Sequence, residues 1–356
     1  MATPIQEKTV FFLGATGYIG SQFLVLLAQE LPLLKIQALV RPPVAEKKKL
    51  LQNIHANISV VEGALHDGAI IEEYASKVDI VINAASSDHL PSVKSILAGL
   101  EKNSASNTGR PPLYIHVSGT GIVSDNCRGN HVDFEKLPIA SDIGLDLNAC
   151  EPTNMHLPED KAIVTAGTRR ENPVRTIIVF PGWVYGIGEG IQKTTLPLRL
   201  FLGMFSKVGH AGTWGEGLNR ACTIHVKDVA RALLVVLSSA LENKADEGAQ
   251  GLYFAVSTRP PMTVHEWASR LGDIMFNKGI LKERGSRPFA DDAIEYLGEY
   301  GWSLLGGNLV VKPERLSKKL GWQASESVKA SILDRLTEEV EEALKLAEFR
   351  DLNSHA

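Results

Sequence analysis

Three glycines with a spacing suited to phosphate binding lie near the start of the chain, in Gly14-Ala-Thr-Gly17-Tyr-Ile-Gly20. The apolar run Val10 to Leu13 precedes them, and the helix-like segment Ser21 to Glu30 follows. Glycine permits a tight turn and lets the backbone approach a pyrophosphate, while a helix N-terminus offers free N–H groups and a positive dipole to the phosphates. A purely structural turn could carry the same glycines, but the strand and helix on either side favour a dinucleotide site.

The residue that follows the second strand bears on the choice between NAD and NADP. An acidic residue there binds the ribose 2′-hydroxyl of NAD, whereas an arginine accommodates the 2′-phosphate of NADP. The chain has Leu39-Val40-Arg41-Pro42 at this point, with no acid, and Lys47 to Lys49 adds positive charge nearby. A guanidinium suits a phosphate geometrically, although a solvated arginine at a strand end is the plainer interpretation. We predict NADP as the cofactor, with NAD as the alternative.

The elements that must position these residues alternate between apolar strands and helices up to about residue 182. Because the strands are apolar throughout, they are expected to be buried on both faces, as in a parallel sheet covered by helices. Strand–helix–strand repetition of this kind predicts an α/β, doubly wound Rossmann fold. The predicted strands are Val10–Leu13, Ile36–Val40, Ile58–Glu62, Asp79–Asn83, Leu113–Val117 and Thr176–Phe180.

Beyond Gly182 the pattern is less regular and more helical. Val226–Leu241 is typical of a helix and Leu252–Val256 of a short strand. Near the end of the chain, an apolar stripe at steps of four indicates core packing more than a partner surface. We predict a Rossmann domain over residues 1–182 and a smaller, mostly helical substrate-binding portion over 183–356, with helix 226–241 packed back on the first domain. The stripe consists of Val328, Ile332, Leu336, Val340 and Leu344.

Five short segments further along the chain resemble, in the correct order, the signatures of one family. With the glycine turn, they make the chain similar to the short-chain dehydrogenase/reductase superfamily, in its extended or atypical branch, which includes NAD-dependent epimerases and dehydratases and an NmrA-like group. Each segment alone is weak, since Asp67 or Asp228 could be an ordinary helix cap, but the resemblance covers almost the whole chain. The segments are Gly63–Asp67, Asn83–Ala85, Pro181–Gly186, Thr223–Ala230 and Glu314–Trp322.

The resemblance implies a set of cofactor contacts at the matching positions. In this family the segment after the third strand approaches the adenine, the end of the fourth strand flanks the adenosine ribose, and a Pro-x-x-Val-Tyr-Gly turn lies beside the nicotinamide. The residues that are thereby implied to bind the cofactor are Gly14, Thr16, Gly17, Tyr18, Ile19, Arg41, Asp67, Ala84, Ala85, Lys161, Pro181, Trp183 and Val184.

The catalytic residues that the resemblance implies are only partly present. The family binds the substrate oxygen with a Ser or Thr after the fifth strand, which matches Ser118 and Thr120. Its proton donor is the tyrosine of a Tyr-x-x-x-Lys helix, but here the residue four before Lys161 is Leu157. His156 could carry the proton because imidazole titrates near neutral pH, although one residue turns a helical side chain by about 100°. The predicted catalytic candidates are therefore Ser118, Thr120, His156 and Lys161. For His156 and Lys161, the alternative is a solvent-exposed position without a catalytic role.

The long connection from Gly121 to Thr153 is of a kind that is usually functional or mobile. We expect it to cover the nicotinamide and to contribute the acid that the motif lacks, with Asp125, His131, Asp133, Asp142 and Asp146 as candidates. An apolar substrate pocket or the core would account for a group of large side chains in the second half. These are Trp183, Phe201, Met204, Phe205 and Trp214.

These observations favour an NADP-dependent oxidoreductase of the carbonyl/alcohol type that acts on a small organic molecule. Two alternatives stay open. One is a non-redox enzyme on the same fold, either an isomerase or cyclase, or a nucleotide-sugar epimerase or dehydratase, whose substrate would need Arg199 or Arg220 for its diphosphate. A non-catalytic protein that senses NADP(H) would also show an intact glycine turn beside a lost tyrosine.

The composition argues against several other classes of protein. The chain has 37 Lys+Arg against 41 Asp+Glu, a formal charge of −4, so it lacks the basic excess of a nucleic-acid binder. No run of 18 apolar residues predicts a membrane span, and the first residues lack the features of a signal peptide. Three cysteines without a CxxC pair predict neither disulfides nor a zinc site. We expect a cytoplasmic protein with a small-molecule substrate and no metal, nucleic acid or membrane partner; a homodimer stays open.

Overall fold

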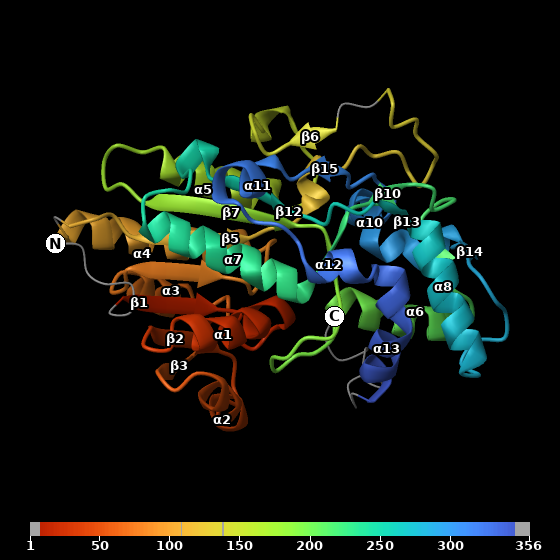
Figure 1. The fold of residues 1–356 in the computed structure, drawn as a ribbon, viewed down its shortest axis with the longest axis horizontal. Coiled ribbons are helices and arrows are strands. Elements are labelled where there is room, and N and C mark those ends of the chain that lie inside the picture. The colour runs from red at the N-terminus through yellow and green to blue at the C-terminus, as the bar shows by residue number, and fades with distance from the viewer. Residues whose placement is uncertain (1–7, 108, 137–138, 346–356) are drawn as a thin grey trace.

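The computed structural model describes residues 8–107, 109–136 and 139–345, and its centre is one parallel β-sheet (Figure 1). The strand order is β12-β7-β5-β4-β1-β2-β3, and every neighbouring pair is parallel. The order reverses at β1, which lies between β2 and β4, as in a doubly wound Rossmann fold. The seven strands are β1 (Thr9–Leu13), β2 (Lys35–Val40), β3 (Ile58–Glu62), β4 (Ile80–Asn83), β5 (Leu113–Val117), β7 (Arg175–Pro181) and β12 (Leu252–Ala255).

Helices cover both faces of this sheet because the strands are apolar on both faces. In β1, Val10 and Phe12 join the hydrophobic cluster under α1 and α7, whereas Phe11 and Leu13 join the cluster under α3, α4 and α5. Burying each large apolar side chain contributes about 1.5–3 kcal/mol, so both clusters hold the sheet in place. The helices are α1 (Tyr18–Glu30), α2 (Ala45–Ile54), α3 (Gly68–Ala75), α4 (Leu90–Ser106), α5 (Leu157–Gly167) and α7 (Val226–Leu241).

A third hydrophobic cluster lies among helices at one end of the sheet (Figure 1). Its helices are α6 (Leu196–Val208), α8 (Val264–Asn277), α9 (Asp291–Ile294), α10 (Gly298–Leu305) and α13 (Ile332–Lys345). The short helix α11 (Glu314–Leu320) instead packs into the cluster under α1 and α7, and α12 (Glu326–Lys329) contacts α7. Short strand pairs join the connecting segments. They are β8 (Trp183–Tyr185) with β11 (Thr223–His225), β9 (Gly212–Thr213) with β14 (Arg287–Pro288), β10 (Arg220–Ala221) with β13 (Met262–Thr263), and β6 (Ala140–Ser141) with β15 (Val311–Lys312).

The predicted strands and the predicted helix 226–241 are confirmed, with ends that differ by one residue at most. The last helix differs from its prediction, because Val328 lies in the separate α12 and is 49% exposed. Ser331 explains the break: its hydroxyl accepts a hydrogen bond from the Asp334 N–H at 3.2 Å and thereby caps a new helix.

The predicted division into two portions after residue 182 stays a prediction. Elements from the second portion pack against elements from the first. The late strand β12 adds to β7 at the edge of the central sheet, and α7 packs on α1. Among the described residues, no helix has the length and apolar character needed to cross a bilayer.

Candidate functional site

The glycine turn joins β1 to α1 where the strand order reverses. Gly14 has a φ of +90°, and an added Cβ there would lie 2.4 Å from the carbonyl carbon of Ala84, directly after β4. An added Cβ at Gly20 would lie 2.0 Å from the Gly14 carbonyl oxygen. The helix that follows begins without a side-chain cap and without an acidic residue in its first turn. The turn therefore fits a dinucleotide pyrophosphate, which would take the free N–H groups of the helix N-terminus.

The side chains of this turn divide between the cofactor site and the interior. Thr16 and Gly17 are half-buried, as is Ile19, which lines the cavity described below. Tyr18 is buried, and its hydroxyl donates a hydrogen bond to the Gly186 carbonyl after β8. Burial raises the pKa of Tyr18 well above its ordinary value, so the phenol stays neutral. Tyr18 thus connects the glycine turn by a hydrogen bond to the segment Pro181–Gly186, which is predicted to lie beside the nicotinamide.

The predicted contacts to the adenosine end follow β2 and β3. Asp67 accepts a hydrogen bond from the Ala64 N–H at 2.7 Å, so one of its carboxylate oxygens holds its own turn together. Arg41 is exposed at the end of β2, and the Lys47 ammonium donates to the Arg41 carbonyl oxygen at 3.0 Å. The Lys47 ammonium therefore lies beside the backbone of Arg41 at the end of β2. The preference for NADP over NAD stays a prediction.

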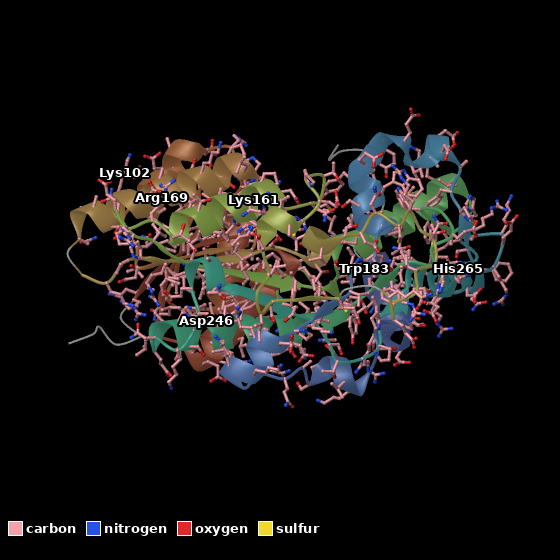
Figure 2. All side chains as sticks on the ribbon, turned by 90° about the horizontal axis from the view of Figure 1, so that it is seen from above. Lys102, Lys161, Arg169, Trp183, Asp246 and His265 are labelled. Atoms are coloured by element: carbon pink, nitrogen blue, oxygen red, sulfur yellow. The ribbon has the colours of Figure 1, made fainter. Side chains whose placement is uncertain are left out.

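A cavity of about 260 Å³ lies at the carboxyl ends of β5 and β7. Residues that follow these two strands form one wall, and helices α6, α8 and α13 contribute the opposite wall. Trp183, in β8, lies between the sheet and the C-terminal helices (Figure 2). The predicted site residues that line the cavity are Tyr18, Ile19, Ser118, Thr120, His156, Pro181, Trp183 and Val184.

Ser118 is held by a buried carboxyl that the sequence did not single out. Its hydroxyl donates to Asp160 Oδ2 at 2.7 Å, and the other oxygen of Asp160 lies 4.0 Å from Nε2 of His116. Burial raises the pKa of Asp160 well above its ordinary value and lowers that of His116 to about 3. His116 is therefore neutral at pH 7, and burial favours the protonated form of Asp160. Asp160 holds the Ser118 hydroxyl in place.

The chain of buried polar contacts from Ser118 through Asp160 to His116 continues to the end of β4. His116 Nδ1 lies 3.1 Å from the Tyr114 hydroxyl and 3.3 Å from the Asn83 amide nitrogen. Asn83 in turn accepts a hydrogen bond from the Ala85 N–H at 3.1 Å. The predicted ribose-flanking residues Ala84 and Ala85 are thus joined through fully buried polar side chains to the serine of the predicted catalytic site.

His156 lies in the wall of the cavity, with only 7% of the residue exposed, so the alternative of a surface position is wrong. It precedes α5 in the left-handed region, with a φ of +68°. Asp88 accepts from both the backbone N–H and the ring Nδ1, at 3.1 and 2.7 Å. Burial alone would raise the pKa of Asp88, but the hydrogen bonds and charge of His156 outweigh it and hold the pKa below its ordinary value.

The far side of the His156 ring packs against glycine. An added Cβ at Gly119 would lie 2.9 Å from His156 Nε2, and one at Gly121 would lie 3.3 Å from it. The absence of side chains after Ser118 therefore makes room for the imidazole. With Asp88 on Nδ1, Nε2 is the nitrogen that remains for exchange with a substrate.

The contact of Lys161 with the cofactor ribose stays a prediction. Lys161 is half-buried on the side of α5 (Figure 2), it is not among the residues that line the cavity, and its charge acts on the Cys150 thiol. Leu157, at the position of the missing tyrosine, is buried in the cluster under the sheet. Because α5 begins at Leu157, the side chain that faces Ser118 is Asp160, three residues into the helix.

The connection 121–153 does not supply an acid to the cavity, so this prediction is wrong for the described residues. Asp125 binds Asn308, and the buried Asp142 accepts from backbone N–H groups of β12 and α11. Asp146 caps the turn at 147–149, Asp133 pairs with Lys136, and His131 is exposed. These polar side chains fold the connection itself.

Of the apolar candidates for the pocket, Trp183 and Phe201 line the cavity. Phe205 and Trp214 are fully buried in the third cluster, and Met204 packs partly buried against it.

Sequence reasoning did not identify Asp88, Asp160 or Glu339, the last of which lines the cavity from α13. Asp160 stands next to Lys161 and Glu339 interrupts an apolar stripe, so each had a faint signal; Asp88 had none.

Comparison with known proteins agrees with this architecture. Residues 6–100 match the model of the NmrA-like family. "Oxidase ucsJ" from Acremonium sp. is 25% identical over 343 residues, which cover 89% of this chain and 92% of that protein.

Solved structures of similar fold have low sequence identity. UDP-glucose 4-epimerase from Thermotoga maritima, with UDP-glucose, aligns over 95% of this chain and 99% of its own, with a TM-score of 0.63 and 15% identity. The dTDP-glucose 4,6-dehydratase DesIV from Streptomyces venezuelae, with NAD bound, covers 95% and 97%, with a TM-score of 0.64 and 16% identity. At these identities the likeness establishes the fold alone.

Proposed function

We propose that the chain is a member of the short-chain dehydrogenase/reductase superfamily and an NADP-dependent oxidoreductase whose proton carrier is His156. The substrate is a small organic molecule with a carbonyl/alcohol pair. The observation that carries the proposal is a cavity wall that combines the Ser118 hydroxyl with an imidazole fixed at Nδ1 by Asp88. NAD is the alternative cofactor.

In the direction of reduction, the carbonyl carbon receives a hydride, which the nicotinamide supplies when bound, and the carbonyl oxygen receives a proton. On substrate binding the Ser118 hydroxyl, which donates to Asp160 in the free protein, turns to donate its hydrogen bond to that oxygen, and Thr120 lines the cavity on the same segment. Protonated His156 gives the proton from Nε2 and takes another from water. Asp88 stabilises the imidazolium before the transfer and holds the ring in place.

Two features support an oxidoreductase over the alternatives. The cavity lining contains no lysine or arginine among the described residues, and neither Arg199 nor Arg220 contributes to it, which disfavours the diphosphate of a nucleotide sugar. A non-catalytic NADP(H) sensor would not need an open cavity with a buried, carboxylate-held imidazole beside it. The arrangement is one that general acid catalysis requires.

The test is the reduction of acetophenone by NADPH in single-turnover experiments with His156→Gln. We expect the rate to fall by about 10²–10⁴-fold, the usual contribution of general acid–base catalysis, while the NADPH affinity from fluorescence titration stays within twofold. His131→Gln, at an exposed position of the 121–153 connection, is the matched control. Tight NADPH binding without turnover in the wild type would favour the sensor, and an unchanged rate in His156→Gln would remove the histidine from the mechanism.

A further inference from the structure

The wall of the cavity opposite Ser118 contains a buried carboxyl that the proposed reaction does not use. Glu339 lies in α13, and only 1% of the residue is exposed. It lines the cavity together with Ile332 and Leu336, at the spacing of one helix face. Its Oε1 has no hydrogen-bond partner among the residues that the structure describes. Buried carboxyl oxygens are normally hydrogen-bonded or paired, so this oxygen points to a ligand.

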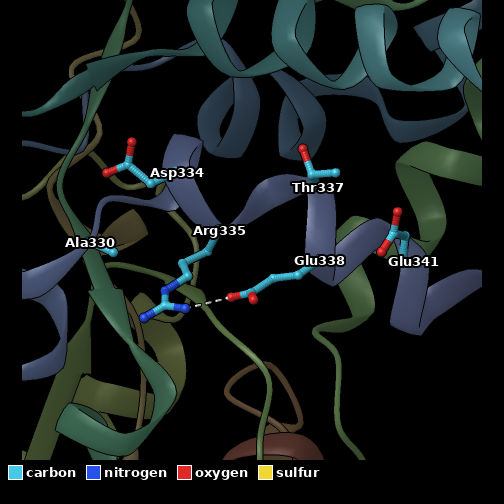
Figure 3. A pocket seen from close by; sticks show the side chains of 6 residues that line it. All are labelled: Ala330, Asp334, Arg335, Thr337, Glu338 and Glu341. Atoms are coloured by element: carbon cyan, nitrogen blue, oxygen red, sulfur yellow. Dashed lines mark hydrogen bonds and ion pairs between the residues drawn. The ribbon is translucent and has the colours of Figure 1, made fainter.

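No neighbouring positive charge in the described part of the chain fully balances the negative charge that an ionised Glu339 would carry. On its own helix, the charge of Arg335, one turn before Glu339, lowers the Glu339 pKa, but Arg335 pairs with Glu338 at 2.9 Å (Figure 3), and the charge of Glu338 raises the same pKa. From α1 and β8 it is faced by the neutral phenols of Tyr18 and Tyr185.

The Glu339 carboxyl has a further polar neighbour, the backbone N–H of Gly186. The Gly186 N–H favours the ionised form of Glu339, but burial is the larger effect and raises its pKa to about 8. The free carboxyl is therefore mostly protonated at pH 7. It would ionise when a positive charge enters the cavity.

Aromatic rings form much of the remaining lining. Trp183 and Trp267 meet edge to face with centroids 5.5 Å apart, and Phe201 lies 5.0 Å from Trp267. Together with Tyr18 and Tyr185 they surround the cavity that Glu339 enters. Aromatic faces attract cations, more strongly when water is excluded. Glu339 and the aromatic rings, with no lysine or arginine among the described lining residues, form a wall complementary to positive charge, while His156 contributes to the lining beside Gly119 and Gly121.

We propose that the substrate carries a positively charged nitrogen, an ammonium or iminium group, which Glu339 and the aromatic rings of the cavity bind while the reacting carbon lies towards Ser118 and His156. This inference names the substrate class of the reductase and rests on the proposed function for the reaction, but the binding step can be measured without turnover.

The experiment compares two probes that differ in charge alone: 4-acetyl-N,N,N-trimethylanilinium and its neutral isostere 4-tert-butylacetophenone. Binding to the full chain is measured by calorimetry at pH 7 in two buffers with different ionisation enthalpies. We expect the cation to bind at least tenfold more tightly than the isostere and to release close to one proton, because Glu339 ionises. The neutral ketone should release none.

Glu339→Gln keeps the shape and removes the charge, so it should weaken the cation at least tenfold, abolish the proton release and leave the neutral ketone within threefold. Glu338→Gln, on the outer face of the same helix, is the matched control and should leave both affinities unchanged. Equal binding of the two probes, binding of neither at millimolar concentration, or a Glu339→Gln loss confined to the ketone would overturn the proposal. Failure of the reductase proposal would appear instead as absence of NADPH oxidation while the cation still binds.

Discussion

The same carboxyl makes a prediction about stability that requires no substrate. With its pKa at about 8 in the folded protein, against 4.5 for an ordinary glutamate, Glu339 keeps its proton on folding over a range in which the unfolded chain releases it. Below pH 4.5 both states hold the proton, so pH has no effect through this group. Between 4.5 and about 8 the folded state binds more protons, and stability therefore falls as pH rises. Above about 8 both states are ionised and the loss levels off.

The size of the effect follows from proton linkage. Each pH unit within the window costs about 1.4 kcal/mol, so Glu339 should lower the free energy of unfolding by about 2–3 kcal/mol between pH 5 and pH 7. Glu339→Gln removes the ionisable group. Any change in the free energy of unfolding that the buried amide causes is independent of pH. The difference in stability between variant and wild type should therefore grow with pH up to about 8 and then stay constant.

The assay is urea unfolding followed by tryptophan fluorescence at pH 5, 6, 7, 8 and 9, for the wild type, Glu339→Gln and Glu338→Gln. Apart from Glu338 and Glu339 themselves, the three proteins have the same titrating groups, whose contributions cancel in the differences. The Glu338 variant, altered at an exposed ion pair, should run parallel to the wild type. A difference for Glu339→Gln that is constant from pH 5 to pH 9, or one that shrinks as pH rises, would refute the burial argument.

Three further changes test the cofactor site and the serine. Gly14→Ala should lower NADPH affinity at least tenfold, because its Cβ would press on Ala84, whereas Gly144→Ala, at a φ of +82° with open space around it, should leave the affinity unchanged; fluorescence titration distinguishes them. Arg41→Ala should weaken NADPH by the contribution of a charge-assisted hydrogen bond, about 1.5–3 kcal/mol, and NADH by less than twofold; equal losses would contradict the 2′-phosphate contact. Ser118→Ala removes a hydrogen bond to the buried Asp160 and should lower the free energy of unfolding by about 1–3 kcal/mol in urea titrations as well as slow ketone reduction; full stability would show that Asp160 has another partner.

Part of the site could be read from the sequence because local chemistry determines it. The glycine turn, the strand before it and the helix after it are consecutive in the chain, and at Gly14 a positive φ and a neighbouring backbone leave no room for a side chain. The same holds for Ser118 and Pro181, which follow strands whose apolar runs were unmistakable. In a parallel sheet, residues after neighbouring strands must meet at one edge, so their association followed from the order of the elements.

The acids of the site depend on tertiary structure. Asp88 reaches His156 across 68 residues of sequence, and Glu339 reaches the cavity from the last helix, more than 200 residues after Ser118. In the sequence, Glu339 is one of the charged residues between the apolar positions of the stripe, yet α13 starts anew at a cap, and the helices around it determine which face points inward. Which carboxyl is buried, and hence which one keeps its proton, depends on desolvation by segments far away in the chain. The sequence by itself determined the fold and the glycine turn, whereas the place of His156 beside the cavity and the burial of Glu339 were decided by the packing of distant elements.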